Sequence, residues 1–520
     1  MRRSGRPPQR EGREDAGPQR SAEERRINMG RVDNVPLQVH ESPAGLTIDD
    51  LRREIVGIDT RVPLLDGTER PYVFLDNAAS TPAFRGVMKA IEEFLPWYSG
   101  VHRGTGFKSL LATDVFDAAH DAVGEFVGAD PERNTVIFTK NTTESINKLS
   151  NRFGFAPGDV VVTTLMEHHS NDLPWRKNAH VIHAGITSDG HLDETALRGI
   201  LAREQGRVKL VALSGASNIT GICSPVHEIA TWVHAAGARI FVDAAQLAPH
   251  RTIEMLPDDD PRHIDFLALS AHKMYAPFGT GALIGPKSFF DAGDPDLVGG
   301  GVVDIVTLDH AVWNRPPHKE EAGSPNVVGG VALAAAIRVL RTVGMDAIAA
   351  HEQELLAYGY ARLAKVKKLR LYGPAERLSE KVGVITFNID GMHHSLTAAI
   401  LGIEGGIGVR DGCFCAHPYV KELLGVGPEE DRVLMAEVIS GDKSRMPGMV
   451  RASIGCYNTH ADIDALVDML DRIAGGAYRG RYRQDRATGA YHAEGYKVDF
   501  TRYCAVAGPR ARERSHSEAS

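Results

Sequence analysis

Polar side chains that could take part in chemistry follow several short apolar runs of this sequence. Asp243 comes directly after the run 239–242, and Lys273 comes four residues after the run 264–269. If these runs are parallel strands, their carboxyl ends meet at one edge of a sheet, where ligands of such sheets bind. We therefore expect the polar residues that follow the runs to lie close together. They are Thr142, Thr143, His168, Asn218, Asp243, Gln246, Ser270, His272 and Lys273.

This combination of residue types suits pyridoxal phosphate. A lysine can form a Schiff base with the aldehyde of that cofactor. A carboxylate can pair with the pyridine nitrogen and keep it protonated, and an imidazole can stack on the ring. Hydroxyls and the backbone N–H groups at the start of a helix can hold the phosphate. The residues therefore predict pyridoxal 5'-phosphate as the cofactor.

The elements that must position these residues can be read from the alternation of apolar runs and helix-like stretches. Short runs rich in Val, Ile and Phe occur at 135–139, 159–163, 208–213, 239–242 and 264–269. Helix-like segments lie between some of them, at 192–204 and 226–236. Strands separated by helices imply crossover connections, so we predict an α/β fold whose large domain has a mostly parallel sheet.

The rest of the chain predicts a second domain and two extensions. A helix over 327–343 is followed by a strand-like run at 382–389 and a helical pattern at 461–473, which together indicate a smaller α+β domain. Residues 1–26 hold few large apolar side chains, as expected of a disordered tail, and they lack the apolar core of a secretory signal. The predicted parts are a tail (1–48), a segment joining the small domain (49–70), the large cofactor-binding domain (71–338), the small C-terminal domain (339–477) and a C-terminal extension (478–520).

Composition excludes several classes of protein. The 520 residues include 59 basic and 67 acidic side chains, so the formal net charge is −8, which gives no electrostatic reason to expect nucleic-acid binding. Five cysteines without a Cys-x-x-Cys pair argue against a disulfide framework and a structural zinc site. No apolar run approaches the roughly eighteen residues of a membrane span. We expect no membrane association, a reducing compartment and hence a cytoplasmic location.

The order of the motifs resembles the class V aminotransferase family, and within it the SufS-type cysteine desulfurases and selenocysteine lyases. The pairing of Val-Asp-Ala-Ala-Gln at 242–246 with Ser-Ala-His-Lys at 270–273 carries the resemblance most directly. The similarity extends over about residues 51–475 and implies the type I fold of pyridoxal-phosphate-dependent transferases. The other matching segments are 75–79, 101–104, 141–144, 166–169, 321–326, 409–415 and 451–453.

The resemblance implies a role for each residue around the cofactor. Lys273 would be the Schiff-base lysine and would carry the proton at Cα. Asp243 would pair with the pyridine nitrogen, Gln246 would bond the phenolic oxygen and His168 would stack on the ring. Ser324 would reach the phosphate of the other protomer, which implies a homodimer. The phosphate of the same protomer would be held by Thr142, Thr143, Ser270 and His272.

Some residues at or beside these positions also have a purely structural interpretation. Asn141 and Glu144 have the spacing of a capping box at a helix start, which leaves the following N–H groups free for a phosphate. His168 and His169 are adjacent, and adjacent side chains usually point apart, so we predict no metal site there. Of the two, His169 is expected to be structural.

The resemblance also implies how an amino acid would be bound. Arg451 would clamp the substrate carboxylate, a task suited to a bidentate guanidinium. Asn218 would contact the substrate or an oxygen of the cofactor. Arg410 and His102 are further candidates for substrate binding.

The cysteines decide which reaction is expected. Cys415 aligns with the catalytic cysteine of the family, and Cys413 lies two residues before it. In an extended stretch, residues two apart point the same way, so both thiols are expected to approach one space, with Cys413 a bystander or a resolving thiol. The alternatives are a redox-inert loop and an adventitious disulfide. A reactive thiol needs a lowered pKa, which Arg410 and nearby histidines could provide.

The predicted function is removal of sulfur from L-cysteine, which yields L-alanine and a persulfide on Cys415 for a sulfur-acceptor protein. Two departures from the family pattern bear on this. Phe414 stands where the family usually has His, in a Gly-Cys-Phe-Cys stretch similar to that of molybdenum-cofactor sulfurases, and residues 425–449 form an insertion that reads as charged and loop-like. The alternatives are a selenocysteine lyase, another C–S lyase, a thiol-independent epimerase-like enzyme of the family and a non-catalytic scaffold.

Overall fold

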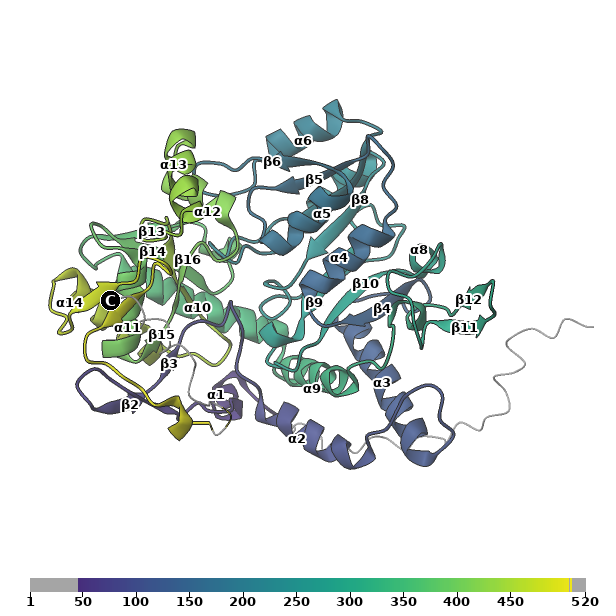
Figure 1. The fold of residues 1–520 in the computed structure, drawn as a ribbon, viewed down its shortest axis with the longest axis horizontal. Coiled ribbons are helices and arrows are strands. Elements are labelled where there is room, and N and C mark those ends of the chain that lie inside the picture. The colour runs from purple at the N-terminus through teal and green to yellow at the C-terminus, as the bar shows by residue number, and fades with distance from the viewer. Residues whose placement is uncertain (1–44, 505, 507–520) are drawn as a thin grey trace, which may run out of the picture. The chain divides into compact units, whose positions relative to one another are not determined.

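The computed structural model describes residues 45–504 and residue 506 (Figure 1). Most of the predicted tail (1–48) and the last residues of the predicted C-terminal extension (478–520) lie outside these described residues. The described residues belong to one compact unit, Ser42–Ser520, and all contacts below are within it.

A seven-stranded sheet forms the centre of the large domain. Five of its strands coincide with the five apolar runs. All neighbouring strands pair parallel except those next to β10, so the predicted mostly parallel α/β fold is confirmed. In their order across the sheet, the strands are β4 (Asn134–Thr139), β10 (Gly281–Pro286), β9 (Phe266–Ser270), β8 (Arg239–Asp243), β7 (Val208–Ser214), β5 (Val160–Thr164) and β6 (His180–Ala184).

The antiparallel strand β10 does not disturb the edge where the candidate residues lie. It pairs antiparallel with β4 on one side and with β9 on the other, so β4 and β9 run in the same direction. The carboxyl ends of β4, β9, β8, β7 and β5 therefore meet at one edge. Gly281 of β10 allows β4 to end close by, because a Cβ there would lie 2.7 Å from Cα of Asn141.

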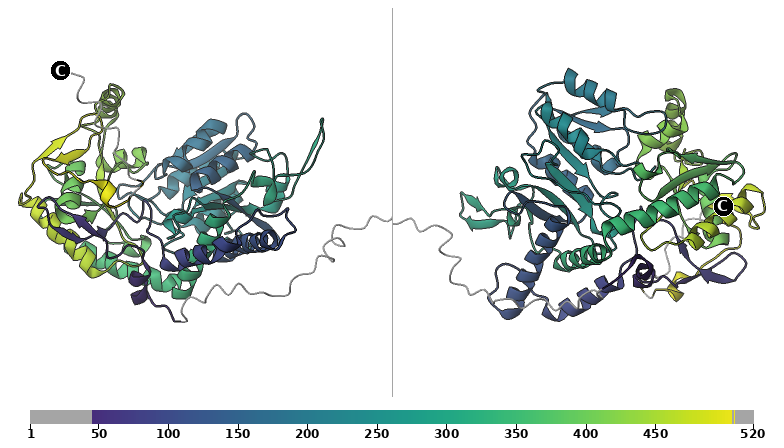
Figure 2. Two further views of the ribbon diagram at one scale, coloured as in Figure 1. Left: turned by 60° about the horizontal axis from the view of Figure 1, so that its bottom comes forward. Right: turned by 180° about the vertical axis from the view of Figure 1, so that it is seen from behind.

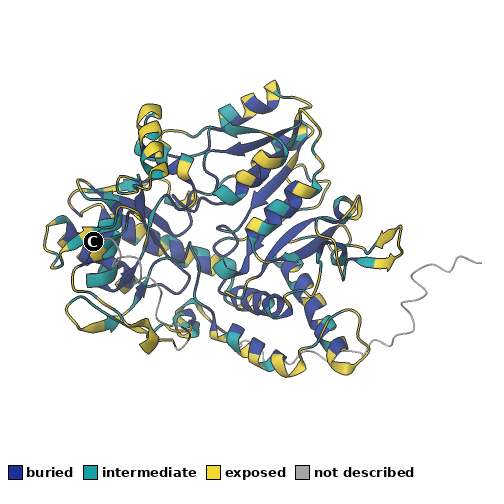
Figure 3. Ribbon diagram, in the orientation of Figure 1, coloured by how far each residue is buried: buried dark blue, intermediate teal, exposed yellow. Residues whose placement is uncertain are grey.

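Helices cover the large sheet (Figures 1 and 2). Ile146 and Leu149 of α4 and Trp175 of α5 pack against Phe241 and Phe266 of the strands, and these residues are fully buried. Figure 3 shows the strands of this sheet as the buried part of the domain. The helices of this region are α2 (Arg85–Phe94), α3 (Phe107–Phe126), α4 (Thr142–Arg152), α5 (Leu173–Asn178), α6 (Glu194–Arg203), α7 (Val226–Ala235), α8 (Lys287–Asp291) and α9 (Val327–Val343).

A smaller antiparallel sheet with its own core forms the second part of the unit. Its strands, in order, are β13 (Leu369–Tyr372), β14 (Val384–Ile389), β17 (Met449–Ser453) and β16 (Arg410–Gly412). Leu355 of one helix and Leu466 and Leu470 of another pack against Phe387 of β14 in this core. The covering helices are α10 (Met345–Leu363), α11 (His394–Gly405) and α14 (His460–Ala474).

Segments from both ends of the described chain attach to this smaller part. Arg52, at the start of the chain, forms an ion pair with Asp462 at 2.8 Å, and Arg479 pairs with Asp66 at 2.9 Å. The early elements are α1 (Leu51–Glu54), β1 (Arg61–Pro63), β2 (Glu69–Pro71) and β3 (Val73–Phe74), and β3 pairs with β15 (Ile407–Gly408). The late elements are the hairpin of β18 (Tyr482–Gln484) and β19 (Tyr491–Ala493).

The insertion 425–449 is not a loop throughout, which corrects the expectation from its sequence. It contains the helix α13 (Pro428–Ile439), which follows α12 (His417–Leu424). Gly427 is the N-cap of α13, Pro428 is its first residue, and three acidic residues follow in the first turn. Proline at the first position and carboxylates near a helix N-terminus both favour helix formation, and they outweigh the high charge that suggested a loop.

Within the described residues, no single helix has the length and apolar character needed to cross a bilayer. The consecutive helices α9 and α10 pass such a test only as a pair that bends by 75°, and only on length and composition. Most residues of α9 are buried in the fold itself.

Candidate active site

A cavity of about 330 Å³ opens at the carboxyl ends of the large sheet, between the sheet and residues of the smaller part. It brings together all the predicted site residues except two. Those lining it are Thr142, Thr143, His168, Asn218, Asp243, Gln246, Ser270, His272, Lys273, Arg410, Cys415 and Arg451.

Lys273 stands at the end of a 3-10 turn that directly follows β9. Its Nζ donates to Oε1 of Gln246 at 3.4 Å. Burial lowers the pKa of Lys273 to about 8, against the opposing effect of the nearby carboxylate of Asp243. The amine is therefore much closer to its neutral, nucleophilic form near neutral pH than an exposed lysine would be.

Asp243 is the last residue of β8 and is buried beneath the cavity. Its Oδ1 accepts a hydrogen bond from the N–H of Ala245 at 2.9 Å. Burial raises its pKa, while that hydrogen bond and the charge of Lys273 lower it. A buried carboxylate in this position is suited to a cationic N–H partner, which would stabilise its charged form.

The N-terminus of α4 forms one end of the cavity. Asn141 caps the helix by accepting the N–H of Glu144 at 3.0 Å, whereas Glu144 turns back to the N–H of Lys140. The N–H and the hydroxyl of Thr142 bond the hydroxyl of Ser270 at 2.9 and 2.8 Å. Hydroxyls and a positive helix terminus at one place make this end suitable for an anion.

His168 lies at the cavity after β5 with its tautomer set by a neighbour. Its Nδ1 accepts the N–H of Ser170 at 3.1 Å, so the proton of the neutral ring is on Nε2. Burial, reinforced by the charge of Lys273, lowers the pKa of His168 to about 3. The ring is therefore neutral near pH 7.

Arg451, on β17 of the smaller sheet, is buried on the opposite side of the cavity. It donates from Nη1 to the carbonyl of Asn218 at 2.9 Å and from Nη2 to Oδ1 of Asp76 at 3.1 Å. Its Nε is buried and has no hydrogen-bond partner. A buried donor without a partner is costly, so the site provides a reason for an anionic group to bind there.

Asp76 holds two arginines of the cavity lining, although its role was not predicted from the sequence. Besides Arg451, it holds Arg410, whose Nη2 lies 2.9 Å from its Oδ2. Asp76 is 375 residues from Arg451 in the chain, so no local pattern could have linked them. Because Asp76 shares its single negative charge between Arg410 and Arg451, it offsets only part of the positive charge of these two arginines.

The cysteine loop, residues 413–416, differs from the extended conformation expected for it. Phe414 and Cys415 have φ values of 48° and 57°, which are both left-handed. Cys415 is exposed and lines the cavity, whereas Cys413 is buried and its thiol donates to the carbonyl of Pro447 at 3.0 Å. The expectation that both thiols approach one space is therefore wrong, because the left-handed turn separates their directions.

The other described cysteines are away from the cavity lining. Burial raises the pKa of Cys413 and of Cys223 to about 11, and it raises the pKa of Cys456 further. Cys504 is exposed near the end of the described chain. All five cysteines are free thiols, so the alternative of a disulfide involving Cys413 does not occur in this structure.

His102 and Ser324 are the two predicted site residues that do not line the cavity. His102 packs against His318, with ring centroids 4.2 Å apart, and the backbone N–H of His102 donates to Oγ1 of Thr113 at 2.8 Å. Ser324 is exposed in the loop before α9, whose N-cap is Asn326.

A buried hydrogen-bond network beneath the cavity was also not predicted from the sequence. Gln246 donates from Nε2 to Nε2 of His250 at 3.2 Å, and Nδ1 of His250 bonds Oε1 of Glu352 at 2.6 Å. Arg251 bonds the other oxygen of Glu352 at 3.3 Å. The network connects the amide next to Lys273 with helix α10. Only the spacing of Gln246 and His250, four residues apart, hinted at it in the sequence.

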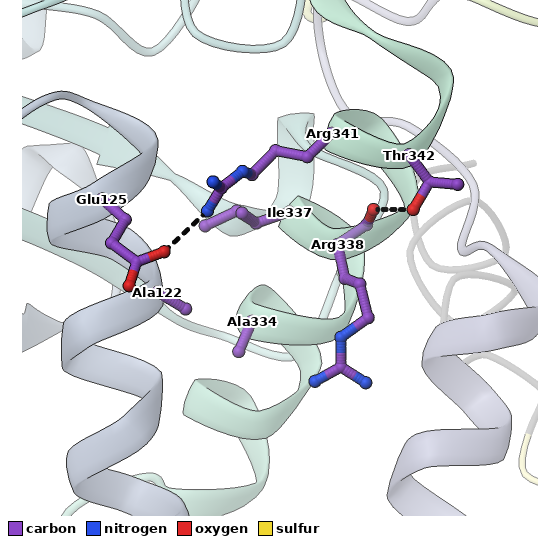
Figure 4. A pocket seen from close by; sticks show the side chains of 7 residues that line it. All are labelled: Ala122, Glu125, Ala334, Ile337, Arg338, Arg341 and Thr342. Atoms are coloured by element: carbon purple, nitrogen blue, oxygen red, sulfur yellow. Dashed lines mark hydrogen bonds and ion pairs between the residues drawn. The ribbon is translucent and has the colours of Figure 1, made fainter. Parts of the chain in front are cut away.

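A second hollow, between α3 and α9, offers much less chemistry (Figure 4). Glu125 and Arg341 form an ion pair across it at 2.8 Å, and the hydroxyl of Thr342 bonds the carbonyl of Arg338 at 2.8 Å. The remaining lining residues are alanines and Ile337. Its volume is about 380 Å³, and its lining residues include no lysine, histidine or cysteine.

Two groups of His and carboxylate side chains lie within metal-ligand reach among the described residues. In the first, His234 and His263 share Asp265 at 3.0 and 3.7 Å, but their rings stack in parallel, 4.1 Å apart and at 16°. The second group consists of His102, Asp117 and His318. In this group, Nδ1 of His102 lies 4.0 Å from Oδ1 of Asp117.

Comparisons with known proteins agree with the site. The class-V aminotransferase family model matches residues 73–466. A probable cysteine desulfurase of Halobacterium salinarum is 37% identical over 452 residues, which cover 85% of this chain and 98% of the relative. The cysteine desulfurase of Haloferax volcanii is 34% identical over 448 residues, with coverages of 84% and 97%.

Solved structures lead to the same family. The apo cysteine desulfurase of Thermococcus onnurineus superposes with a TM-score of 0.71 at 31% identity, covering 83% of this chain and 100% of that one. The cysteine desulfurase CsdA of Escherichia coli gives a TM-score of 0.68 at 30% identity, with coverages of 84% and 100%. Because the family model matches most of this chain and its relatives are cysteine desulfurases, this chain belongs to the class-V aminotransferase family.

Proposed function

We propose that this protein is a pyridoxal-phosphate-dependent cysteine desulfurase, which converts L-cysteine to L-alanine and leaves the sulfur as a persulfide on Cys415. The observation that carries the proposal is the presence of an accessible thiol, Cys415, in the same cavity as the buried amine of Lys273 and the guanidinium of Arg451. The names of the relatives support the choice of substrate.

The residues of the cavity fit pyridoxal phosphate. Lys273 would hold the aldehyde carbon and Asp243 the pyridine nitrogen, and the neutral ring of His168 would cover the aromatic face. Hydroxyls at the N-terminus of α4, together with Ser270 and His272, would hold the phosphate. When bound, the cofactor supplies an aldehyde for the amino group of the substrate and a ring that stores the electrons of the Cα–H bond.

Arg451 and Lys273 would position and deprotonate the substrate. The partnerless Nε of Arg451 supports a substrate carboxylate at this guanidinium, which Asp76 and the carbonyl of Asn218 hold in place. The amine of Lys273, with a pKa of about 8, is suited to take the Cα proton and return one to the product.

Cys415 would then take the sulfur. A bond forms between its Sγ and the sulfur of the substrate while the Cβ–S bond of the substrate breaks, and that electron pair stays with the three-carbon fragment. Protonation of this fragment gives alanine, so no external oxidant or reductant is needed. The exposure of Cys415 supports subsequent transfer of the persulfide sulfur to an acceptor protein.

We further propose a homodimer, in which Ser324 and His102 serve the site of the other protomer. Exposed apolar side chains support a partner surface, since large exposed apolar patches usually mark an interface. They lie on the 3-10 turn Leu95–Trp97, on α3 and on the hairpin of β11 (Val303–Val306) and β12 (Ala311–Trp313), and Arg103, which precedes α3, donates to the carbonyl of Val303 at 2.9 Å. They are Trp97, Phe107, Leu110, Ile305, Val306, Leu308 and Val312. The five free thiols support a reducing compartment such as the cytoplasm.

A panel of amino acids offered to the purified, cofactor-loaded protein tests the proposal. Cysteine should give equimolar alanine and protein-bound or released sulfur, and selenocysteine reports on the lyase alternative. Turnover of non-sulfur amino acids with no alanine from cysteine would favour the epimerase-like alternative. A protein that binds no cofactor, judged by absorbance and borohydride trapping, would leave only the scaffold alternative.

A further inference from the structure

The cysteine loop adopts a conformation that its own residues do not favour. Phe414 and Cys415 are consecutive non-glycine residues in the left-handed region, with φ values of 48° and 57°. Side chains other than glycine and asparagine rarely adopt this conformation, and it persists only where the surroundings hold it. The contacts that hold the loop are therefore part of what points Cys415 at the cavity.

Two donors from the large domain hold the carbonyls of these residues. Nδ2 of Asn218 donates to the carbonyl of Phe414 at 2.9 Å, and the N–H of His169 donates to the carbonyl of Cys415 at 2.7 Å. Both donors follow strands of the large sheet, whereas the loop belongs to the smaller part. The loop is thus held across the cavity.

Helix α12 begins directly after the loop without a cap of its own. Its N-cap, Ala416, has no side chain that could accept a hydrogen bond, and Pro418 has no N–H to be satisfied. The N–H of His417 instead donates to Nε2 of His169 at 3.2 Å. The ring of His169 therefore acts as an N-cap supplied from a distant segment, and its Nε2 must be the unprotonated nitrogen.

The segment that carries His169 is firmly attached to the large sheet. Glu167 is buried, and its carboxylate accepts hydrogen bonds from Thr164 at 2.6 Å, from Asn171 at 2.6 Å and from the hydroxyl of Ser214 at 2.6 Å. These bonds fix the short turn that contains His169 from both sides.

We propose that His169 is a positioning residue that holds the thiol of Cys415 at the cavity by capping helix α12 with its imidazole. Its backbone N–H bonds the carbonyl of Cys415 and its Nε2 accepts the N–H of His417, so the two contacts lie on either side of Ala416. The adjacent His168 lines the cavity, so one anchored turn serves both the cofactor position and the cysteine loop. The inference rests on the proposed role of Cys415 as the nucleophile.

Three variants of the full-length protein separate the cap from the bulk of the ring. His169→Phe keeps the size of the ring and removes the acceptor, whereas His169→Gln places a carbonyl oxygen within similar reach of the His417 N–H. His417→Phe is the matched control, because it removes a neighbouring imidazole, 4.7 Å from that of His169, and keeps the backbone N–H. If His169→Phe does not fold, His169→Asn replaces it, since its side chain is too short to reach.

Two measurements need neither cofactor nor substrate. Amide hydrogen exchange of the peptide containing His417 should be about fivefold faster in His169→Phe, as expected for the loss of one cap. Alkylation of Cys415 by iodoacetamide, measured by mass spectrometry relative to the exposed Cys504 in the same molecule, should be faster by a similar factor. His169→Gln should restore both values toward wild type, and His417→Phe should leave both near wild type.

Wild-type exchange and a wild-type alkylation ratio in His169→Phe would overturn the inference. So would a His169→Gln variant that behaves like His169→Phe, because the acceptor atom would then be irrelevant. In the loaded enzyme, His169→Phe should lower kcat for alanine formation with little change in KM. If the wild-type protein releases no alanine at all, the proposed function fails, while the exchange and alkylation results still decide the role of His169.

Discussion

The two sides of the cavity are built in different ways. The sheet side, with Asp243, Ser270 and Lys273, stands at the ends of regular strands, and each residue takes its position from the strand before it. The cysteine loop instead holds Phe414 and Cys415 in left-handed conformations that cost about 1–3 kcal/mol each, and contacts from distant segments maintain them. The sheet side therefore depends on the sheet, and the loop depends on contacts between the two parts of the molecule.

The largest expected effect is on the sheet side. Lys273→Ala removes the only lysine amine that lines the cavity among the described residues, so borohydride should trap no cofactor on the protein. Alanine formation should fall by about 10³-fold or more, since both the covalent anchor and the proton carrier are lost. Absorbance and trapping measure the first effect, and alanine release measures the second. Stable borohydride labelling of the variant at another lysine would contradict the assignment.

A smaller effect, on rate, should come from pH. Burial lowers the pKa of Lys273 to about 8 from the usual value of 10.5, and only the neutral amine attacks an aldehyde. The rate at which cofactor-free protein takes up pyridoxal phosphate should therefore rise as the pH rises through about 8 and level off above it. Stopped-flow absorbance measures this rate. A rate that keeps rising to pH values near 10.5 would mean that Lys273 titrates as an exposed lysine.

The smallest effect should come from the thiol that the loop turns away. Cys413→Ser keeps a donor for the carbonyl of Pro447, and Cys413 does not line the cavity. Alanine formation and persulfide loading should stay close to wild type. A large loss of persulfide transfer in this variant would show that Cys413 acts as a resolving thiol, and the comparison of the two cysteines would have to be redrawn.

The two sides of the site could be predicted from the sequence to different extents, because one is positioned by local features of the chain and the other by distant contacts. The positions of Asp243 and Lys273 follow from period and strand order, which are local properties. The direction of the Cys413 thiol was predicted wrongly, because nothing in four residues of sequence reveals a left-handed turn imposed by Asn218 and His169. The double ion pair of Asp76 with Arg410 and Arg451 is equally non-local.

The fold shows a similar division. The five strands predicted from apolar runs all form, because a buried parallel strand needs a continuous run of such residues. Helix α13 was expected to be a loop, although Pro428 and the acidic residues after it mark a helix start. That signal was outweighed by the high charge of the segment, which reflects its exposure and not its backbone conformation. His102 was assigned to substrate binding from the family resemblance and does not line the cavity of this chain, whereas Ser324 was assigned to the phosphate of the other protomer.

The most direct test of the account is alanine release by Cys415→Ser at full cofactor occupancy. Cys415 is the only cysteine among the described residues that lines the cavity, so the variant should keep the absorbance of the bound cofactor and its attachment to Lys273. It should form neither alanine from L-cysteine nor a persulfide. Alanine release at the wild-type rate from this variant would contradict the account, because the sulfur would then leave without the thiol of Cys415.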